Sequence, residues 1–428
     1  MPSTTPSADS EPDTPSTSRR RIAIVGAGAA GTMAAIFASR AGAEVLLLER
    51  TADGGKKILI SGGGRCNILP SRLDETRFIT DSSPNTLRKI VRSWPLAEQI
   101  RFFNDELGLA LVEEIGSAKL FPASNRARDV RDGLLSLAAR HGAFLRTNTS
   151  VDGIAPLEEN RWRVSIADGE PLEVDAVIVA SGGLSVPRTG SDGVGLKVAR
   201  KLGHTINKTY PALTPITAEP SAFTELAGVS LPVTLTAHSS ERAATATGGF
   251  LFTHRGYSGP SVLDVSHVAV RSKARDAKPA RITVRWCARD ADEWTRALRR
   301  SGNRSVLGVL REVLPDRLAT VLLWYAGVDE TRSIPDLKRE ERASLIDVLL
   351  NGALPWSGDE GYAKAEVTGG GVSLAEIDPR TMESRLHRNL FLCGELLDAF
   401  GPIGGYNFLW AWVTGRAAGM GAADATQR

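Results

Sequence analysis

Residues 21–49 read RIAIVGAGAAGTMAAIFASRAGAEVLLLE, and this stretch decides the fold. The run at 21–25 has the apolar, β-branched character of a buried parallel strand and leads directly into a GxGxxG turn at 26–31. Apolar residues at helical spacing follow, Gly42 is placed to end that helix, and a second strand at 44–48 ends in the acid Glu49. This order predicts a dinucleotide-binding unit; the alternative is an α/β turn without a nucleotide.

Each glycine of the turn has a physical task. Gly26 allows the tight turn, Gly28 lets a pyrophosphate approach the backbone, and Gly31 lets helix and strand pack closely. Ala29 and Ala30 open the helix, whose free N–H groups and dipole attract an anion. The turn therefore predicts where the phosphates of a dinucleotide bind.

The acid and the loop after it extend the predicted site. Glu49 would accept hydrogen bonds from an adenosine ribose, and Arg50 follows it directly. Residues 51–67 read TADGGKKILISGGGRCN, a loop whose backbone can approach a flat or phosphorylated ligand, with Lys57 and Arg65 available for negative charge. The alternative is a flexible surface loop. The other candidate cofactor residues in this loop are Ser61, Gly62, Cys66 and Asn67.

Composition narrows the class of protein. The chain has 428 residues, enough for two or three domains, with 42% hydrophobic and 24% charged residues. A net charge of only +3, with both signs interspersed, gives no reason to expect a nucleic acid or a membrane as partner. Three separated cysteines and six histidines without ligand spacing predict no disulfide and no metal, and favour a reducing cytoplasm. The first 18 residues have the composition of a disordered tail.

Six stretches together resemble the BaiN/YhiN-type family of bacterial NAD(P)/FAD-dependent oxidoreductases. They read KKILISGGGRCN at 56–67, LFPASNRARDV at 120–130, VIVASGGLSVPRTGSDGVG at 177–195, LFTHRGYSGPSVLDVS at 251–266, VTGGGVSLAEIDPRTMES at 367–384 and CGELLDAFGPIGGYNFLWAWVTG at 393–415. The resemblance implies FAD as cofactor and NADH or NADPH as electron donor. It also implies hydride transfer to an unsaturated or carbonyl-conjugated organic small molecule.

The resemblance adds further cofactor residues. It implies that the backbone of Val151 holds the adenine, although an ordinary core valine is the alternative. It implies that the chain returns to the cofactor at Ser181 and Gly182. It places Glu395 and Asp398, after Gly394, at the ribityl or pyrophosphate end of FAD.

A Gly-Gly turn before the last helix would direct backbone N–H groups and the helix dipole at the pyrimidine edge of the flavin. An amphipathic closing helix with a glycine-rich lead is the alternative. The candidate residues of this turn are Ile403, Gly404, Gly405, Tyr406 and Asn407. Cys66 and Cys393 are placed near the ring or are buried, inert thiols.

The proton donor is the least defined part of the predicted site. In the turn at 253–260, His254 is a candidate proton donor because histidine is the residue type that exchanges protons near neutral pH, and Tyr257 could assist through a hydrogen bond. A structural histidine in a glycine-proline turn is the alternative. No second GxGxxG unit with its own acid is present, which argues against a separate nicotinamide-binding domain.

The predicted architecture is α/β. A discontinuous Rossmann-type FAD-binding domain, at 19–207 and 362–428, is interrupted at 208–361 by a β-rich insert with a helical subdomain that covers the substrate cleft. Two other functions stay open: a flavoprotein without turnover that carries electrons or acts as a scaffold, and a flavin-dependent enzyme that modifies RNA. The sequence does not define the oligomeric state.

Overall fold

A five-stranded parallel sheet forms the first part of the fold in the computed structural model, which describes residues 19–219, 223–274, 278–299 and 304–424. The strand order is β20-β10-β1-β2-β6. The strands are β1 (Arg21–Val25), β2 (Glu44–Leu48), β6 (Phe144–Arg146), β10 (Ala176–Val179) and β20 (Leu390–Leu392). The predicted first strand is therefore central. The disordered tail predicted for residues 1–18 lies outside the described residues.

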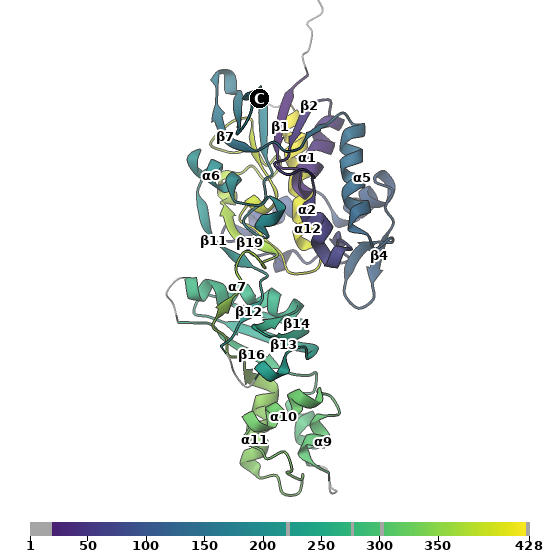
Figure 1. Cartoon of the computed structure of the whole chain (residues 1–428), viewed down its shortest axis with the longest axis vertical. Coiled ribbons are helices and arrows are strands. Elements are labelled where there is room, and N and C mark those ends of the chain that lie inside the picture. The colour runs from purple at the N-terminus through teal and green to yellow at the C-terminus, as the bar shows by residue number, and fades with distance from the viewer. Residues whose placement is uncertain (1–18, 220–222, 275–277, 300–303, 425–428) are drawn as a thin grey trace, which may run out of the picture.

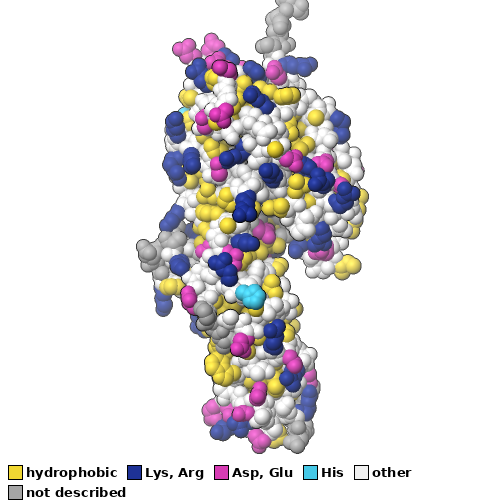
Figure 2. Space-filling model, in the orientation of Figure 1, with side chains coloured by type: hydrophobic (Ala, Val, Ile, Leu, Met, Phe, Trp, Pro, Cys, Tyr) yellow, Lys and Arg dark blue, Asp and Glu magenta, His cyan; other side chains and the backbone are white. Residues whose placement is uncertain are grey.

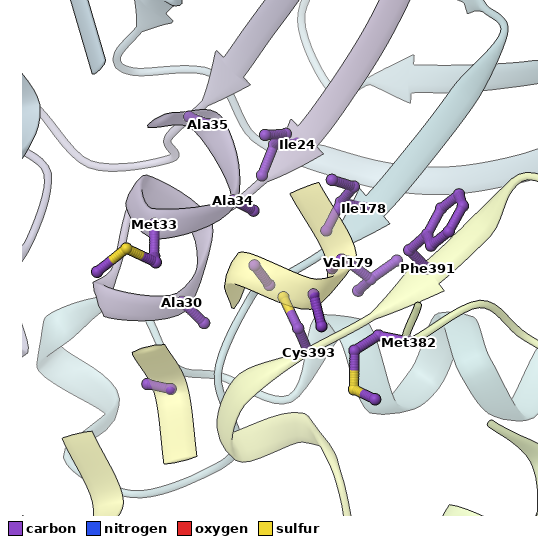
Figure 3. Close-up of a cluster of buried hydrophobic side chains, with 14 of the residues drawn as sticks. Ile24, Ala30, Met33, Ala34, Ala35, Ile178, Val179, Met382, Phe391 and Cys393 are labelled. Carbon is purple, nitrogen blue, oxygen red and sulfur yellow. The ribbon is translucent and has the colours of Figure 1, made fainter. Parts of the chain in front are cut away.

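Two helices pack closely beside this sheet. A β-carbon at Gly415 of α12 (Tyr406–Ala423) would lie 2.3 Å from the carbonyl oxygen of Ala30 in α1 (Ala29–Arg40), and one at Gly419 would lie 2.4 Å from that of Ala34. Only glycine allows this approach of the two backbones. Figure 3 shows the core here, in which Ala30 and Ala34 of α1 lie near Ile178 and Val179 of β10.

Smaller antiparallel sheets surround the parallel sheet. They are β3-β5-β4, β7-β8-β9 and the pair β11-β19. Their bounds are β3 (Leu69–Pro70), β4 (Leu111–Glu114), β5 (Lys119–Pro122), β7 (Val151–Pro156), β8 (Trp162–Ile166), β9 (Leu172–Val174), β11 (Ile206–Ala212) and β19 (Val367–Val372). Strand β4 has no buried face, so its sequence gives no alternating pattern by which a strand could be predicted. The helices of this part are α2 (Lys56–Ile60), α3 (Pro84–Arg92), α4 (Leu96–Arg101), α5 (Ala127–Arg140) and α6 (Val194–Lys201).

A seven-stranded antiparallel sheet forms the insert, in the order β17-β16-β13-β14-β15-β12-β18. Its strands are β12 (Ile216–Thr217), β13 (Ser230–His238), β14 (Ala243–Thr253), β15 (Gly256–Ser258), β16 (Arg281–Arg285), β17 (Gly352–Ala353) and β18 (Gly358–Asp359). The helices are α7 (Pro260–Ala274), α8 (Ala291–Ala297), α9 (Val306–Leu310), α10 (Asp316–Tyr325) and α11 (Arg339–Asn351). Figure 1 shows the parallel-sheet part, this sheet with α7, and α9 to α11 succeeding one another along the long axis.

Helix α7 is missing from the sequence prediction, which treated its stretch as β-rich. The valines at 262, 265 and 268 are β-branched and suggest strands, but they recur every three residues and are buried on one helical face. They belong to a core that is separate from the core of the parallel sheet.

The predicted fold class, a Rossmann-type α/β fold with an inserted β-rich domain, is confirmed. The domain boundaries at 207/208 and 361/362 stay predictions. No helix within the described ranges is both long and apolar enough to cross a membrane.

Candidate FAD and substrate site

A cavity of about 1000 Å³ opens at the carboxyl ends of the central strands. Val25 and Leu48 end β1 and β2 there, Ala180 directly follows β10, and Leu263 of α7 borders the cavity from the insert. Open α/β sheets bind ligands at this edge, and the volume is at the upper end of about 300–1,000 Å³ for small-molecule sites. The predicted cofactor residues on its wall are Gly26, Gly28, Ala29, Ala30, Glu49, Arg50, Lys57, Ser61, Gly62, Arg65, Asn67, Val151, Ser181, Gly182, Gly394, Glu395, Ile403, Gly404, Gly405 and Asn407.

The three glycines of the turn have different roles. Gly26 and Gly31 are required by the fold, and Gly28 leaves space for a ligand. Gly26 has a φ of +103°, and a β-carbon on Gly31 would lie 1.8 Å from the carbonyl oxygen of Gly26. A β-carbon on Gly28 would meet no protein atom within 4 Å. Gly28 also begins α1 without a hydrogen bond from a capping side chain. The N-terminus of α1 is therefore open to a ligand, as a bound pyrophosphate requires.

Glu49 is held in place by the turn that it follows. It is buried, its Oε2 accepts from the Ala27 N–H at 3.0 Å, and its Oε1 accepts from the N–H and hydroxyl of Thr51 at 2.9 and 2.8 Å. Val151 is also buried on the cavity wall, and Arg50 forms an ion pair with Asp192. A carboxylate oriented in this way presents a fixed acceptor for a ribose hydroxyl.

Lys57 and Glu395 form an ion pair across the cavity wall. Lys57 Nζ lies 2.6 Å from Glu395 Oε2 and donates to the Ser185 hydroxyl at 2.7 Å. Glu395 Oε1 accepts from the Ser185 hydroxyl and from the N–H and hydroxyl of Thr368, at 3.0 and 2.9 Å for Thr368. The Lys57 ammonium is thus bound by protein groups. The neighbouring Glu395 carboxylate offsets most of the positive charge that a ligand in the cavity would meet.

The glycine-rich loop is tied to its neighbours. Arg65 forms an ion pair with Glu114 at 2.8 Å, and its guanidinium lies 4.2 Å from the centroid of the Phe121 ring. With its amide oriented to satisfy both partners, Asn67 donates to the Leu69 carbonyl and accepts from the Gly405 N–H at 3.0 Å. The loop is therefore held in place and forms part of the cavity wall.

The turn before α12 is likewise fixed by side chains. The Ile403 N–H donates to Asp264 Oδ1 at 2.7 Å, and Asn407 exchanges two hydrogen bonds with Gly401, both 2.9 Å long. Two of the backbone N–H groups expected at a flavin, those of Ile403 and Gly405, thus already have side-chain partners. The N-terminus of α12 still lines the cavity and has no hydrogen bond from a capping side chain.

Asp398 lies away from the cavity. Its carboxylate accepts from the Thr80 hydroxyl, the Asp81 N–H, the Ser82 hydroxyl and the Asn207 amide at 3.0, 3.0, 2.8 and 2.6 Å. Burial raises its pKa, although the hydrogen bonds act in the opposite direction. Asp398 therefore holds the segment at 80–82 against β11, which differs from the cofactor contact that the resemblance implied.

Three further predicted cofactor residues do not line the cavity. Gly31 packs against the turn, and Tyr406 lies on the core side of α12, where its hydroxyl accepts from the Asp74 N–H at 3.2 Å. Cys66 is fully buried, and burial raises the pKa of its thiol to about 12. Cys393, which Figure 3 shows in the core, also has a raised pKa because of burial. Both cysteines have the character of inert thiols.

The two predicted catalytic residues do not line the cavity either. His254 is exposed in the turn between β14 and β15. Tyr257 is buried in the core of the insert, where its ring lies 5.6 Å from that of Phe250, and its hydroxyl has no hydrogen-bond partner among the described residues. Neither position supports a role in proton transfer.

Several cavity residues were missed by the sequence analysis. Lys119 and Phe121 come from β5, Phe400 from the segment after β20, and Glu366 from the bend just before β19. No local motif marks them, because each reaches the cavity only through tertiary packing of segments far apart in the sequence. Phe121 and Phe400 lie inside two of the stretches that carry the family resemblance, at 120–130 and 393–415, whereas Lys119 and Glu366 lie just outside such stretches.

The cavity fits a flavin dinucleotide. It combines an uncapped helix N-terminus beside Gly28, an oriented acid at Glu49 and a second helix N-terminus after Gly405. Fold and site together define an FAD-binding protein of the Rossmann type.

Comparison with known proteins gives the family. The family described as HI0933-like protein Rossmann domain matches residues 20–421, and the chain belongs to this family. Similar proteins include a 3-dehydro-bile acid delta(4,6)-reductase of Clostridium scindens, 31% identical over 94% of this chain and 99% of that protein. They also include a ribosomal RNA dihydrouridine synthase of Escherichia coli, 31% identical over 91% of this chain and 94% of that protein. The predicted family resemblance and the assignment as a flavoprotein oxidoreductase are confirmed.

A solved structure supports the fold. The 3-ketosteroid delta1-dehydrogenase of Sterolibacterium denitrificans matches with a TM-score of 0.51 and 14% identity, over 95% of this chain and 100% of that chain. At this identity the likeness concerns the fold alone.

Proposed function

We propose that this chain is an FAD-dependent reductase that takes a hydride from NADH or NADPH and passes it to a carbon–carbon double bond conjugated with a carbonyl group. One observation carries the proposal. The same cavity reaches from the dinucleotide turn at Gly28 to the N-terminus of α12 and to Leu263 of the insert, so cofactor and acceptor would share one cavity.

The names of the two relatives support the choice of acceptor. A delta(4,6)-reductase acting on a 3-dehydro bile acid saturates double bonds conjugated with a ketone. A dihydrouridine synthase saturates the ring double bond of uracil, which is also conjugated with a carbonyl. The common chemistry is addition of a hydride and a proton across an electron-poor double bond, and this chemistry is what we assign to the chain.

The residues of this chain would hold FAD along the length of the cavity. The N-terminus of α1 beside Gly28 would bind the pyrophosphate, Glu49 the ribose and Val151 the adenine. The N-terminus of α12 would face the pyrimidine edge, where its dipole favours negative charge. FAD, when bound, supplies the hydride chemistry, and the protein supplies binding, orientation and electrostatics.

Oxidation of NADH or NADPH in the presence of candidate acceptors tests this function. The acceptors are cyclohexenone, a steroid enone and a saturated ketone as the matched control. We expect acceptor-dependent oxidation of the nicotinamide with the two enones and none with the ketone, and a product with two added hydrogens by mass spectrometry. Equal rates with all three acceptors, or with none, would contradict the proposal.

A second candidate is reduction of uridine in ribosomal RNA, because two relatives, from Escherichia coli and Haemophilus influenzae, are ribosomal RNA dihydrouridine synthases at 31% identity. Figure 2 shows basic and acidic side chains interspersed on the visible face, without a basic stripe of the kind that binds nucleic acid. We therefore favour the small molecule. Transcribed ribosomal RNA that gains dihydrouridine with NAD(P)H, with binding weakened steeply by salt, would reverse this preference.

A further inference from the structure

A glutamate that the sequence analysis did not select lies on the wall of the cavity. Glu366 immediately precedes β19, at the point where the chain returns from the insert to the parallel-sheet part. Its backbone N–H donates to the Leu213 carbonyl at 3.1 Å, and its neighbours Ala365 and Val367 are buried. The backbone is therefore fixed, while the side chain is accessible from the cavity and is surrounded by protein atoms of its concave wall.

Among the described residues the Glu366 carboxyl has no protein partner, which among the acids on the cavity wall it shares with Asp152, next to Val151 in the strand predicted to hold the adenine. Glu49 and Glu395 accept hydrogen bonds from the turn and from Lys57, and Asp192 pairs with Arg50. Across the described ranges, the Glu366 carboxyl takes part in neither a hydrogen bond nor an ion pair. A carboxyl that the protein leaves unpaired inside a ligand cavity is available to a ligand.

Three charged groups face Glu366 from different elements, and they place it at the flavin end of the cavity. Asp264 of α7 holds the Ile403 N–H, Lys119 of β5 lies beside Gly404, and Lys57 of α2 pairs with Glu395. Desolvation raises the pKa of Glu366 and the negative charge of Asp264 adds to this effect, while Lys119 and Lys57 act in the opposite direction. The protonated carboxyl is thereby favoured above the usual pH range of a glutamate.

We propose that Glu366 is the proton donor of the reductase, a role that rests on the proposed function. The hydride adds to one carbon of the double bond, the electron pair of that bond moves toward the carbonyl group, and the other carbon takes the proton of the Glu366 carboxyl. Water then returns a proton to the carboxylate. Each turnover consumes the electron pair of one NADH or NADPH, so atoms and electrons balance.

The Glu366→Gln variant, with the cofactor reduced photochemically, tests the donor in the acceptor step alone. Cyclohexenone should reoxidise the variant about 10²–10⁴-fold more slowly than the wild type, the usual contribution of general acid catalysis. Reduction of the cofactor by NAD(P)H should stay within about twofold, because that step needs no proton from Glu366. Glu366→Asp should recover part of the lost rate, and Glu360→Gln, in the same segment but outside the cavity, should match the wild type.

The pH dependence gives a readout that a structural role would not produce. The acceptor step in the wild type should slow as rising pH deprotonates Glu366, and Glu366→Gln should lack this decline. An infrared difference spectrum of wild type minus Glu366→Gln, recorded without acceptor, should show a protonated carboxyl band that disappears with the same midpoint.

Failure of this proposal differs from failure of the proposed function. A wild type that reduces cyclohexenone, with Glu366→Gln equally fast at every pH, overturns the donor and leaves the reductase intact. A wild type whose reduced cofactor no enone reoxidises overturns the reductase and the donor together.

Discussion

Lys57 Nζ lies 2.6 Å from Glu395 Oε2 and joins two walls of the cavity that are 338 residues apart in the chain. The Lys57 side chain is 27% exposed and that of Glu395 is 16% exposed, so water solvates each charge poorly and each depends on the other for stabilisation. The pair therefore couples the glycine-rich loop region to the last parallel strand at the site itself.

Breaking this pair should destabilise the protein. Lys57→Met keeps the apolar stem and leaves the Glu395 charge without its cation, which should cost roughly 1–3 kcal/mol in the free energy of unfolding. Urea unfolding with FAD in excess measures it. The Lys57→Met/Glu395→Gln double variant should recover part of the loss, whereas simple additivity of the single changes would show that the two side chains are not coupled.

Two glycines of one motif should behave differently. Gly28→Ala places its β-carbon in open space, so we expect stability within about 1 kcal/mol of wild type but FAD affinity lower by about tenfold or more. Gly31→Ala directs its β-carbon at the Gly26 carbonyl oxygen and should lose roughly 2 kcal/mol or more of stability. Unfolding curves of the FAD-free proteins and FAD titrations separate the two effects. Equal stability losses would contradict the assignment of Gly28 to the ligand.

Asp398 should act on the fold rather than on the cofactor. Asp398→Ala leaves four donors without their acceptor and should lower the free energy of unfolding by roughly 3 kcal/mol or more. FAD affinity of the folded protein should stay within a few-fold. A variant of wild-type stability that had lost FAD would restore the cofactor role implied by the family resemblance.

Acid should destabilise the protein through His267 of α7. Burial, together with the charges of Arg242 and Arg271, lowers its pKa from 6.5 to about 3. Between these pH values the unfolded chain binds a proton that the folded chain does not, so stability falls as pH falls. Asp264 acts in the opposite sense, because burial raises its pKa to about 6.

The contribution of His267 can be isolated by substitution. Between pH 7 and pH 4, the free energy of unfolding of His267→Leu should fall by roughly 3 kcal/mol less than that of the wild type. Urea unfolding at each pH measures it. His254→Leu, at an exposed histidine, should follow the wild type. Parallel pH curves for wild type and His267→Leu would contradict the buried neutral histidine.

The sequence could predict those parts of the site that lie within one short stretch of the chain. The turn at 26–31 and the acid Glu49 lie within one βαβ unit, so the spacing of residues places them in space. The family resemblance implied that Asp398, an acid after a parallel strand, contacts FAD. In the structure its carboxylate instead accepts hydrogen bonds from residues 80–82, which no local pattern indicates. Glu366 and Lys119 were beyond prediction, since the packing of the insert and of β5 brings them to the cavity.

The central claim is that this cavity holds FAD and that a nicotinamide reduces it. The most direct measurement is the visible absorption spectrum of the purified protein, recorded anaerobically before and after addition of NADH and then NADPH. We predict a flavin spectrum that one of the two donors bleaches. A protein that stays colourless after incubation with FAD, or a flavin that neither donor reduces, would contradict the claim.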